Sequence, residues 1–291
     1  MNLQDLKSQF KPVHAIALPM VLSAISLPLL GIVDTAILGH LDSEIYLASV
    51  NVGSSALNML LWGLGFLRMS TTGLVAQSHG ANNNKLSADH MRRALSLATF
   101  MGLALVALQP VLIPLQLYLL ANGGQAAVLA SDYMQIRYFS LPFSLLLFVL
   151  NGYFLATNQA GKVLKLMLLS QISNIILDAS FVMLLHWDVK GVALGSLISE
   201  FLAASLGLFW IFQSILMKSP PLSNIRSGNK PLSWQAFFKL NSDIFIRTAC
   251  LITVFTYMTK QSALQGDIIL ASNAVLMNFF YLTAYGLDGY A

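Results

Sequence analysis

Residues 41–66 read LDSEIYLASVNVGSSALNMLLWGLGF, and residues 264–289 read LQGDIILASNAVLMNFFYLTAYGLDG. The two segments align without gaps, and eight of their 26 positions are identical. Chance similarity between two apolar helices is the alternative, but hydrophobicity alone does not produce identities in the polar turn. The alignment pairs the second helix of the chain with the eighth, which predicts a six-helix repeat. An even number keeps both copies in one orientation, as in parallel transporter repeats with a site between two lobes.

The composition places this repeat in a membrane. Of 291 residues, 56% are hydrophobic and only 10% are charged, whereas a soluble domain carries about 25% charged residues. This excludes a soluble globular enzyme and a disordered chain. The lysines and arginines are scattered between apolar blocks, so we expect no nucleic-acid partner. The single cysteine, Cys250, excludes an internal disulfide framework.

Eight stretches are long and apolar enough to cross a bilayer, which takes about 20 residues. Their approximate limits are 14–39, 46–77, 92–114, 133–156, 163–185, 191–215, 242–261 and 267–291. We therefore expect an all-α polytopic membrane protein with eight of twelve transmembrane helices, in two pseudo-symmetric six-helix lobes of which the second is incomplete. The predicted division is an N-terminal lobe at 1–216, a cytoplasmic linker at 217–240, and the first two helices of a C-terminally truncated lobe at 241–291.

The basic residues predict the orientation of these spans. One side of the membrane receives eleven of them: Lys7, Lys11, Lys85, Arg92, Arg93, Lys162, Lys165, Lys218, Arg226, Lys230 and Lys239. The other side receives Lys190 and Lys260, while Arg68, Arg137 and Arg247 fall within spans. This bias predicts a multi-pass protein with its N-terminus and its 217–240 linker in the cytoplasm.

Ionisable residues at membrane depth are functional candidates, because burying them costs several kcal/mol. Asp34 lies near the outer third of the first span, which also contains Pro19 and Pro28. Proline removes a backbone donor and kinks a helix, so this span can bend. A titratable carboxyl group on such a helix is suited to couple a proton to a shape change; the alternative is that Asp34 caps the helix end.

Further polar residues occur in three other spans. Asn174 and Asp178 are four residues apart, as are Ser196 and Glu200, so each pair shares a helix face. With Asn151, these residues offer oxygen atoms that suit a proton or a small hard cation. The alternative is that the asparagines and serines only link neighbouring helices by hydrogen bonds.

Several motifs together resemble the multidrug and toxic compound extrusion (MATE) family of antiporters, and in particular its DNA-damage-inducible F (DinF) branch. They are IVDTAILGHL at 32–41, GFLRMSTTGLVAQSHGA at 65–81, NGYFLATNQ at 151–159, LNSDIFIRT at 240–248 and YGLDGYA at 285–291. The resemblance runs along essentially the whole chain and implies twelve helices in two lobes, in a bacterial plasma (inner) membrane. It also implies that protonation of Asp34 bends the first helix at Pro19, opposite a polar cluster that matches Asn151, Asn174, Asp178 and Ser196.

The expected function is therefore a proton-coupled antiporter that exports amphipathic or cationic compounds by alternating access. The alternatives are sodium coupling, with the ion at Asp34 and Asp178, and a lipid-linked-sugar flippase, which would favour a cavity rich in basic residues. An intramembrane prenyltransferase would need paired carboxylates or a histidine cluster, so we expect no enzyme. We also expect no cofactor, no other metal and a monomer in the bilayer.

Overall fold

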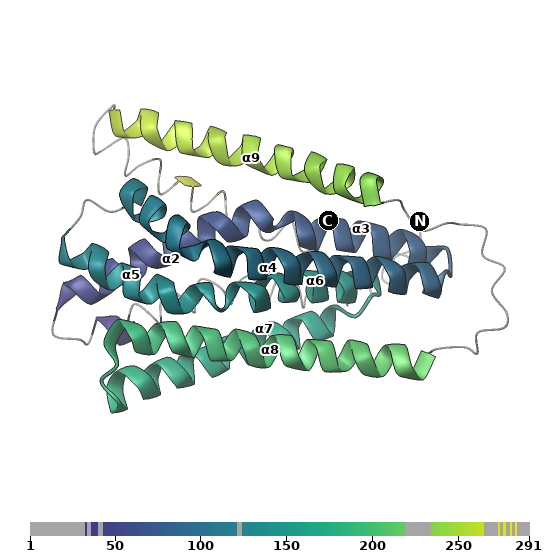
Figure 1. Ribbon diagram of the computed structural model, residues 1–291, viewed down its shortest axis with the longest axis horizontal. Coiled ribbons are helices and arrows are strands. Elements are labelled where there is room, and N and C mark those ends of the chain that lie inside the picture. The colour runs from purple at the N-terminus through teal and green to yellow at the C-terminus, as the bar shows by residue number, and fades with distance from the viewer. Residues whose placement is uncertain are drawn as a thin grey trace, which may run out of the picture.

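The computed structural model describes residues 33, 36–39, 43–120, 124–218 and 234–264, together with positions 273, 276, 277, 280 and 283. The described part of the chain is almost entirely helical (Figure 1). Its helices are α2 (Glu44–Leu64), α3 (Phe66–Gly80), α4 (Asn84–Leu120), α5 (Gln125–Tyr138), α6 (Leu141–Ala156), α7 (Ala160–Ala179), the π-helical η1 (Ser180–Leu184), α8 (Asp188–Lys218) and α9 (Trp234–Leu264).

The helices lie side by side as a bundle, with α4 and α6 in the middle, α7 and α8 along one side and α9 along the other (Figure 1). Four segments are long and apolar enough to cross a membrane: Ile45–Gly80, Asn84–Leu120, Ala160–Leu184 and Asp188–Gln213. The pair formed by α5 and α6 makes a fifth if it is counted as one bent span. The predicted all-α, multi-span architecture is thus confirmed. The first and eighth predicted spans lie almost wholly outside the described residues.

The helices extend beyond several of the predicted apolar limits. Helix α4 begins at Asn84 rather than at 92, because Asn83 ends the preceding turn and its Oδ1 accepts a hydrogen bond from the Leu86 amide at 3.0 Å. Helix α9 begins at Trp234, inside the predicted linker 217–240. Residues 219–233 lie outside the described residues. The apolar pattern located the membrane-crossing part of each helix, whereas capping and helix propensity set the ends.

The fourth predicted span, 133–156, is not a single straight helix. Helix α5 begins at Gln125, and α6 leaves it at a 52° bend after Tyr138. Pro142 lies in the first turn of α6, where its missing amide hydrogen is tolerated and where it cannot continue the preceding helix. On α4, Gly102 faces this break so closely that a Cβ there would lie 2.5 Å from the Cα of Pro142. The bend between α5 and α6 therefore packs tightly against α4.

Two apolar clusters form the interior. One centres on Leu57, Met134 and Tyr138 of α2 and α5, and the other on Leu67 and Leu145 of α3 and α6, with further side chains from α4, α7 and α8. A buried hydrogen-bond chain crosses the first cluster. The Tyr138 hydroxyl donates to Gln116 Oε1 at 2.7 Å, and Gln116 Nε2 donates to the Ala56 carbonyl at 3.0 Å. These polar groups satisfy one another inside the bundle, as an apolar surrounding demands.

Helices α3 and α6 approach each other at Gly152. A Cβ on Gly152 would lie 2.7 Å from the Arg68 carbonyl oxygen and 3.0 Å from Thr71 Cβ. Small residues permit such contacts between membrane helices. We expect Gly152→Ala to lower the free energy of unfolding by about 1–3 kcal/mol, because the backbone of α3 must move away.

The measurement is the thermal unfolding of the purified variant in detergent. Gly73→Ala is the control, since Gly73 lies in α3, the helix that Gly152 of α6 contacts, but a Cβ there would meet nothing within 4 Å. Gly73→Ala should leave the melting temperature unchanged or raise it slightly, because alanine favours helix. Equal melting temperatures for the parent and Gly152→Ala would contradict the tight α3–α6 contact.

Candidate functional site

A buried polar cluster joins α7 and α8. Asp178 is fully buried and Asn174 is 3% exposed. The amide nitrogen Nδ2 of Asn174 donates to Asp178 Oδ2 at 3.0 Å and to Ser196 Oγ at 3.3 Å. The four-residue spacing of Asn174 and Asp178 places both on one face of α7, and that face meets Ser196 across the helix contact. The structure therefore brings together three of the predicted site residues.

A glycine of α8 makes room for the Asp178 side chain. A Cβ built on Gly195 would overlap Asp178 Oδ1 and would also lie 3.3 Å from the Asp178 backbone nitrogen. Any larger residue at position 195 would push α8 away from α7 or displace the carboxyl group. Gly195 is thus part of the cluster, although sequence reasoning did not include it. Its position next to Ser196 was the available signal.

Two more amide side chains, on α7 and α6, were candidates for this cluster or lie beside it in sequence. Gln171 is 8% exposed and lies one turn before Asn174 on the same face of α7. Sequence reasoning missed it, although its spacing of three and seven residues from Asn174 and Asp178 indicated a continuous polar stripe. Asn151 of α6 is half-buried. Its Oδ1 has no hydrogen-bond partner within the described part of the chain, and no hydrogen bond there joins Asn151 to Asn174, Asp178 or Ser196.

Glu200 belongs to a different contact. Its Oε1 accepts a hydrogen bond from Arg137 Nη1 of α5 at 2.9 Å, which forms an ion pair with side-chain exposures of 12% for Arg137 and 17% for Glu200. The Ser144 hydroxyl of α6 donates to the second oxygen, Oε2. Glu200 therefore lies one turn beyond Ser196 on α8 but is engaged with α5 and α6. The sequence placed both Arg137 and Glu200 within spans, so their opposite charges were the signal that could have paired them.

The ion pair lies at the bend between α5 and α6. Ser140 follows the end of α5, where its hydroxyl donates to the Arg137 carbonyl at 2.8 Å and accepts from Arg137 Nη1. Ser144 donates to the Ser140 carbonyl at 3.2 Å as well as to Glu200. Backbone groups released by the helix break are thus satisfied by neighbouring hydroxyls, and α8 is tied to both halves of the bent span.

Two predicted residues cannot be placed. Asp34 and Pro19 lie outside the described residues. The neighbouring Ile37 and Leu38 are described and are buried in the first apolar cluster with Leu57 and Met134. The segment that follows Asp34 in sequence therefore packs into the lobe interior.

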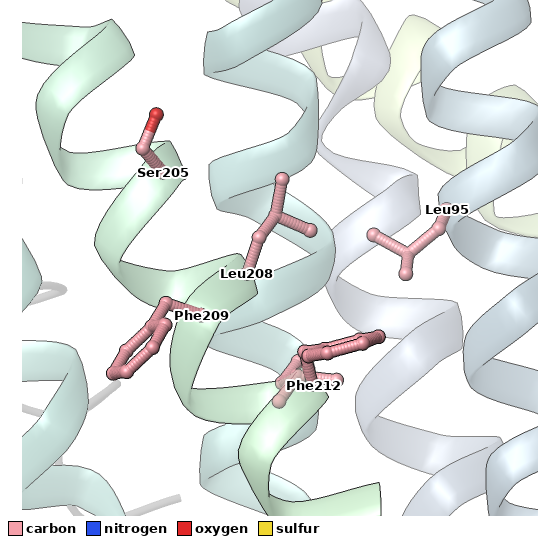
Figure 2. A pocket seen from close by; sticks show the side chains of 6 residues that line it. Leu95, Ser205, Leu208, Phe209 and Phe212 are labelled. Atoms are coloured by element: carbon pink, nitrogen blue, oxygen red, sulfur yellow. The ribbon is translucent and has the colours of Figure 1, made fainter. Parts of the chain in front are cut away.

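A surface hollow between α4 and α8 is apolar. Its volume is about 460 Å³, and its lining residues are Leu95, Ser205, Leu208, Phe209, Ile211 and Phe212. Figure 2 shows Leu95 of α4 opposite Leu208 and Phe212 of α8. The Ser205 hydroxyl is the sole polar side-chain group in this lining, so the hollow offers no charged group that would bind an ion.

The two polar contacts allow different chemistry. The Asn174–Asp178–Ser196 cluster combines one carboxyl group with neutral donors and acceptors, which suits reversible binding of a proton or another small cation. Glu200 already has a cationic partner in Arg137, and together they form a structural ion pair. Among the described residues, no group of three or more His, Cys, Asp or Glu side chains is arranged to hold a metal ion.

Comparison with known sequences gives consistent matches. Residues 19–180 match the MatE family. The chain is 40% identical over 292 residues to DNA damage-inducible protein F of Escherichia coli (strain K12), a match that covers 98% of this chain and 62% of that protein. It is 26% identical over 289 residues to multidrug export protein MepA of Staphylococcus haemolyticus, covering 97% of this chain and 62% of the relative. The chain thus spans 62% of the length of both relatives.

Solved structures share the fold. A transporter of the MOP superfamily from Pyrococcus furiosus superposes with a TM-score of 0.82 at 17% identity, over 96% of this chain and 62% of that one. An outward-facing multidrug resistance transporter of the MATE family superposes with a TM-score of 0.80, also at 17% identity and with the same coverage. The expected architecture is thereby confirmed.

The Arg137–Glu200 ion pair leads to a stability prediction. We expect Glu200→Gln to lower the free energy of unfolding by about 3 kcal/mol, because it leaves the nearly buried Arg137 cation without its counter-charge. Thermal unfolding in detergent measures the effect.

The matched control is Asp132→Asn. Asp132 and Lys190 also join α5 to α8, with Nζ and Oδ2 3.1 Å apart, but their side chains are 35% and 61% exposed. Loss of such an exposed pair costs less than about 1 kcal/mol. If both variants lost the same stability, the Arg137–Glu200 pair would be no more important than an exposed one.

Proposed function

Because the chain belongs to the MatE family of transporters, we propose that it forms part of a proton-coupled antiporter that exports amphipathic, cationic compounds across a bacterial inner membrane. The family consists of transporters, not enzymes. Transport proceeds by alternating access between a cytoplasmic and an outward opening. The coupling ion, the substrates and the orientation are parts of this proposal.

The observation that carries the proposal is the complete burial of Asp178 inside an apolar bundle. A charged carboxylate in such a place is costly, and a bound proton removes the charge. The neutral amide of Asn174 donates a hydrogen bond to Asp178 Oδ2, and the carboxyl group can accept this bond in its charged and in its protonated form. Asp178 is therefore suited to take up and release a proton during each cycle.

Coupling requires that proton and substrate favour opposite states of the protein. Each ligand shifts the equilibrium only by its differential affinity for the two states. In the proposed cycle, the substrate favours the conformation in which Asp178 is ionised. A proton from outside favours the conformation in which the substrate site is lost. Asp34 and the bend at Pro19 are the predicted partners in this change, with Asn151 as a further polar group.

The substrate class is supported by the relatives and by the few charges of the chain. Multidrug export is the named activity of the Staphylococcus haemolyticus relative. Three arginines, Arg68, Arg137 and Arg247, fall in the interior of the spans predicted from the sequence, and Arg137 is paired with Glu200. Such a lobe suits a cationic or neutral amphipathic substrate better than a pyrophosphate. The bias of lysine and arginine supports a cytoplasmic N-terminus.

We expect Asp178→Asn to abolish proton-driven export, because asparagine keeps the shape and cannot exchange a proton. The measurement is uptake of ethidium, a cationic dye, into inverted membrane vesicles from cells that express the protein. An acid-inside pH gradient should drive uptake by the parent, while vesicles with Asp178→Asn should match vesicles without the protein. Immunoblotting establishes equal amounts of protein in the membrane.

Asp132→Asn is the control here too, since it removes an exposed carboxylate outside the cluster and should keep the parent rate. Asp34→Asn should behave as Asp178→Asn does. A parent rate of ethidium uptake with Asp178→Asn would refute proton coupling at this residue. Uptake driven by a sodium gradient alone, without a pH gradient, would replace the proton by sodium as the coupling ion.

A further inference from the structure

Helix α8 makes its two buried polar contacts on successive turns. Ser196 accepts the hydrogen bond from Asn174, and Glu200 accepts the one from Arg137. Four residues correspond to one turn and about 6 Å along the axis, so both side chains project from one face of the helix. The Ser199 hydroxyl, which is buried between them, donates to the Ser196 carbonyl at 2.9 Å. This stretch of α8 is a short rigid connection between the two contacts.

We propose that Arg137 and Glu200 are positioning residues for proton binding at Asp178: their ion pair fixes the turn of α8 that presents Gly195 and Ser196 to the Asn174–Asp178 face of α7. This inference rests on the proposed function, because it assigns Asp178 as the proton-binding group. It gives Glu200 a role different from that of a second proton carrier.

The contacts of Glu200 explain this assignment. Both carboxylate oxygens are engaged, Oε1 by Arg137 and Oε2 by Ser144. The nearly buried Arg137 cation and the Ser144 hydroxyl thus hold the Glu200 carboxylate in one place, and its contribution is geometric.

The placement of α8 matters because the hydrogen bonds and packing around Asp178 tolerate little movement of this helix. The hydrogen bond from Asn174 to Ser196 is 3.3 Å long, so a small outward movement of α8 would break it. An inward movement is blocked, since Gly195 already packs against the Asp178 carboxyl group without space for a Cβ. Only a narrow range of positions of α8 keeps the amide of Asn174 shared between Asp178 and Ser196.

Fixing that range needs a second contact of α8, which Glu200 makes one turn beyond Ser196. Arg137 and Ser144 supply it from α5 and α6, on both sides of the 52° bend. The Lys190–Asp132 pair joins the same two helices, α5 and α8, but it is exposed, with a side-chain exposure of 61% for Lys190. Exposed pairs contribute little. Removing each ion pair in turn therefore distinguishes a positioning role of Glu200 from a general attachment of α8 to α5.

The experiment is infrared difference spectroscopy of the protein in lipid nanodiscs, titrated with acid. A protonated carboxyl group has a C=O stretching band that reports its hydrogen bonds, and the Asp178 band is the one that disappears in Asp178→Asn. We expect Glu200→Gln to move this band to higher wavenumber, because a displaced Ser196 no longer holds the Asn174 amide in the orientation from which it donates to Asp178. Asp132→Asn should leave the band in place.

A charge-reversed variant, Arg137→Glu combined with Glu200→Arg, should restore most of the parent band position. Should Glu200→Gln not be recovered in folded form, Ser144→Ala replaces it, since that variant keeps the ion pair and removes one of the two contacts of Glu200. It should shift the band in the same direction by a smaller amount.

The outcomes separate the two proposals. A parent Asp178 band that Glu200→Gln (or Ser144→Ala in its place) does not move overturns the positioning role and leaves proton coupling intact. An equal shift with Asp132→Asn also overturns it, because any α5–α8 contact would then suffice. If the parent shows no Asp178 band at any pH, proton binding at Asp178 is refuted and the positioning role falls with it.

Discussion

The amide nitrogen of Asn174 donates to the Asp178 carboxyl group and to the Ser196 hydroxyl, and this shared donor requires α7 and α8 to lie in close contact. In water the three groups would each find other partners. Inside an apolar bundle they depend on one another, since an unsatisfied polar group there costs several kcal/mol. The contact permits no side chain at Gly195 and fixes how the two helices pack. The remaining helices accommodate this pair.

The bundle separates its buried charges by function. Arg137 and Glu200 neutralise each other, and two serine hydroxyls complete their hydrogen bonds at a break in the helix. Asp178 accepts its described hydrogen bond from the neutral amide of Asn174. In the proposed cycle, the ion pair holds the helices in place while Asp178 binds and releases a proton.

Much of the fold follows from the sequence, because a bilayer requires long apolar helices and the chain has few charges to interrupt them. Spacing also indicated which face of α7 carries Asn174 and Asp178. The partner of Glu200 did not follow, since four-residue spacing to Ser196 identifies a helix face but not the helix that it meets. The bend after Tyr138 was missed because apolar content continues through it, although Pro142 was a visible signal. The predicted positions of Asp34 and Pro19 lie outside the described residues.

The two polar contacts of α8 also differ in when they become available as the chain is synthesised. Asn174 and Ser196 are 22 residues apart on consecutive helices, so the amide meets its hydroxyl as soon as α8 follows α7 into the bilayer. Arg137 precedes Glu200 by 63 residues, and it enters the membrane before its counter-charge has been made. Ser140, only three residues after Arg137, accepts a hydrogen bond from the guanidinium within the same segment. The serine at the bend thus gives the arginine a local partner during the interval in which α6 and α7 are inserted.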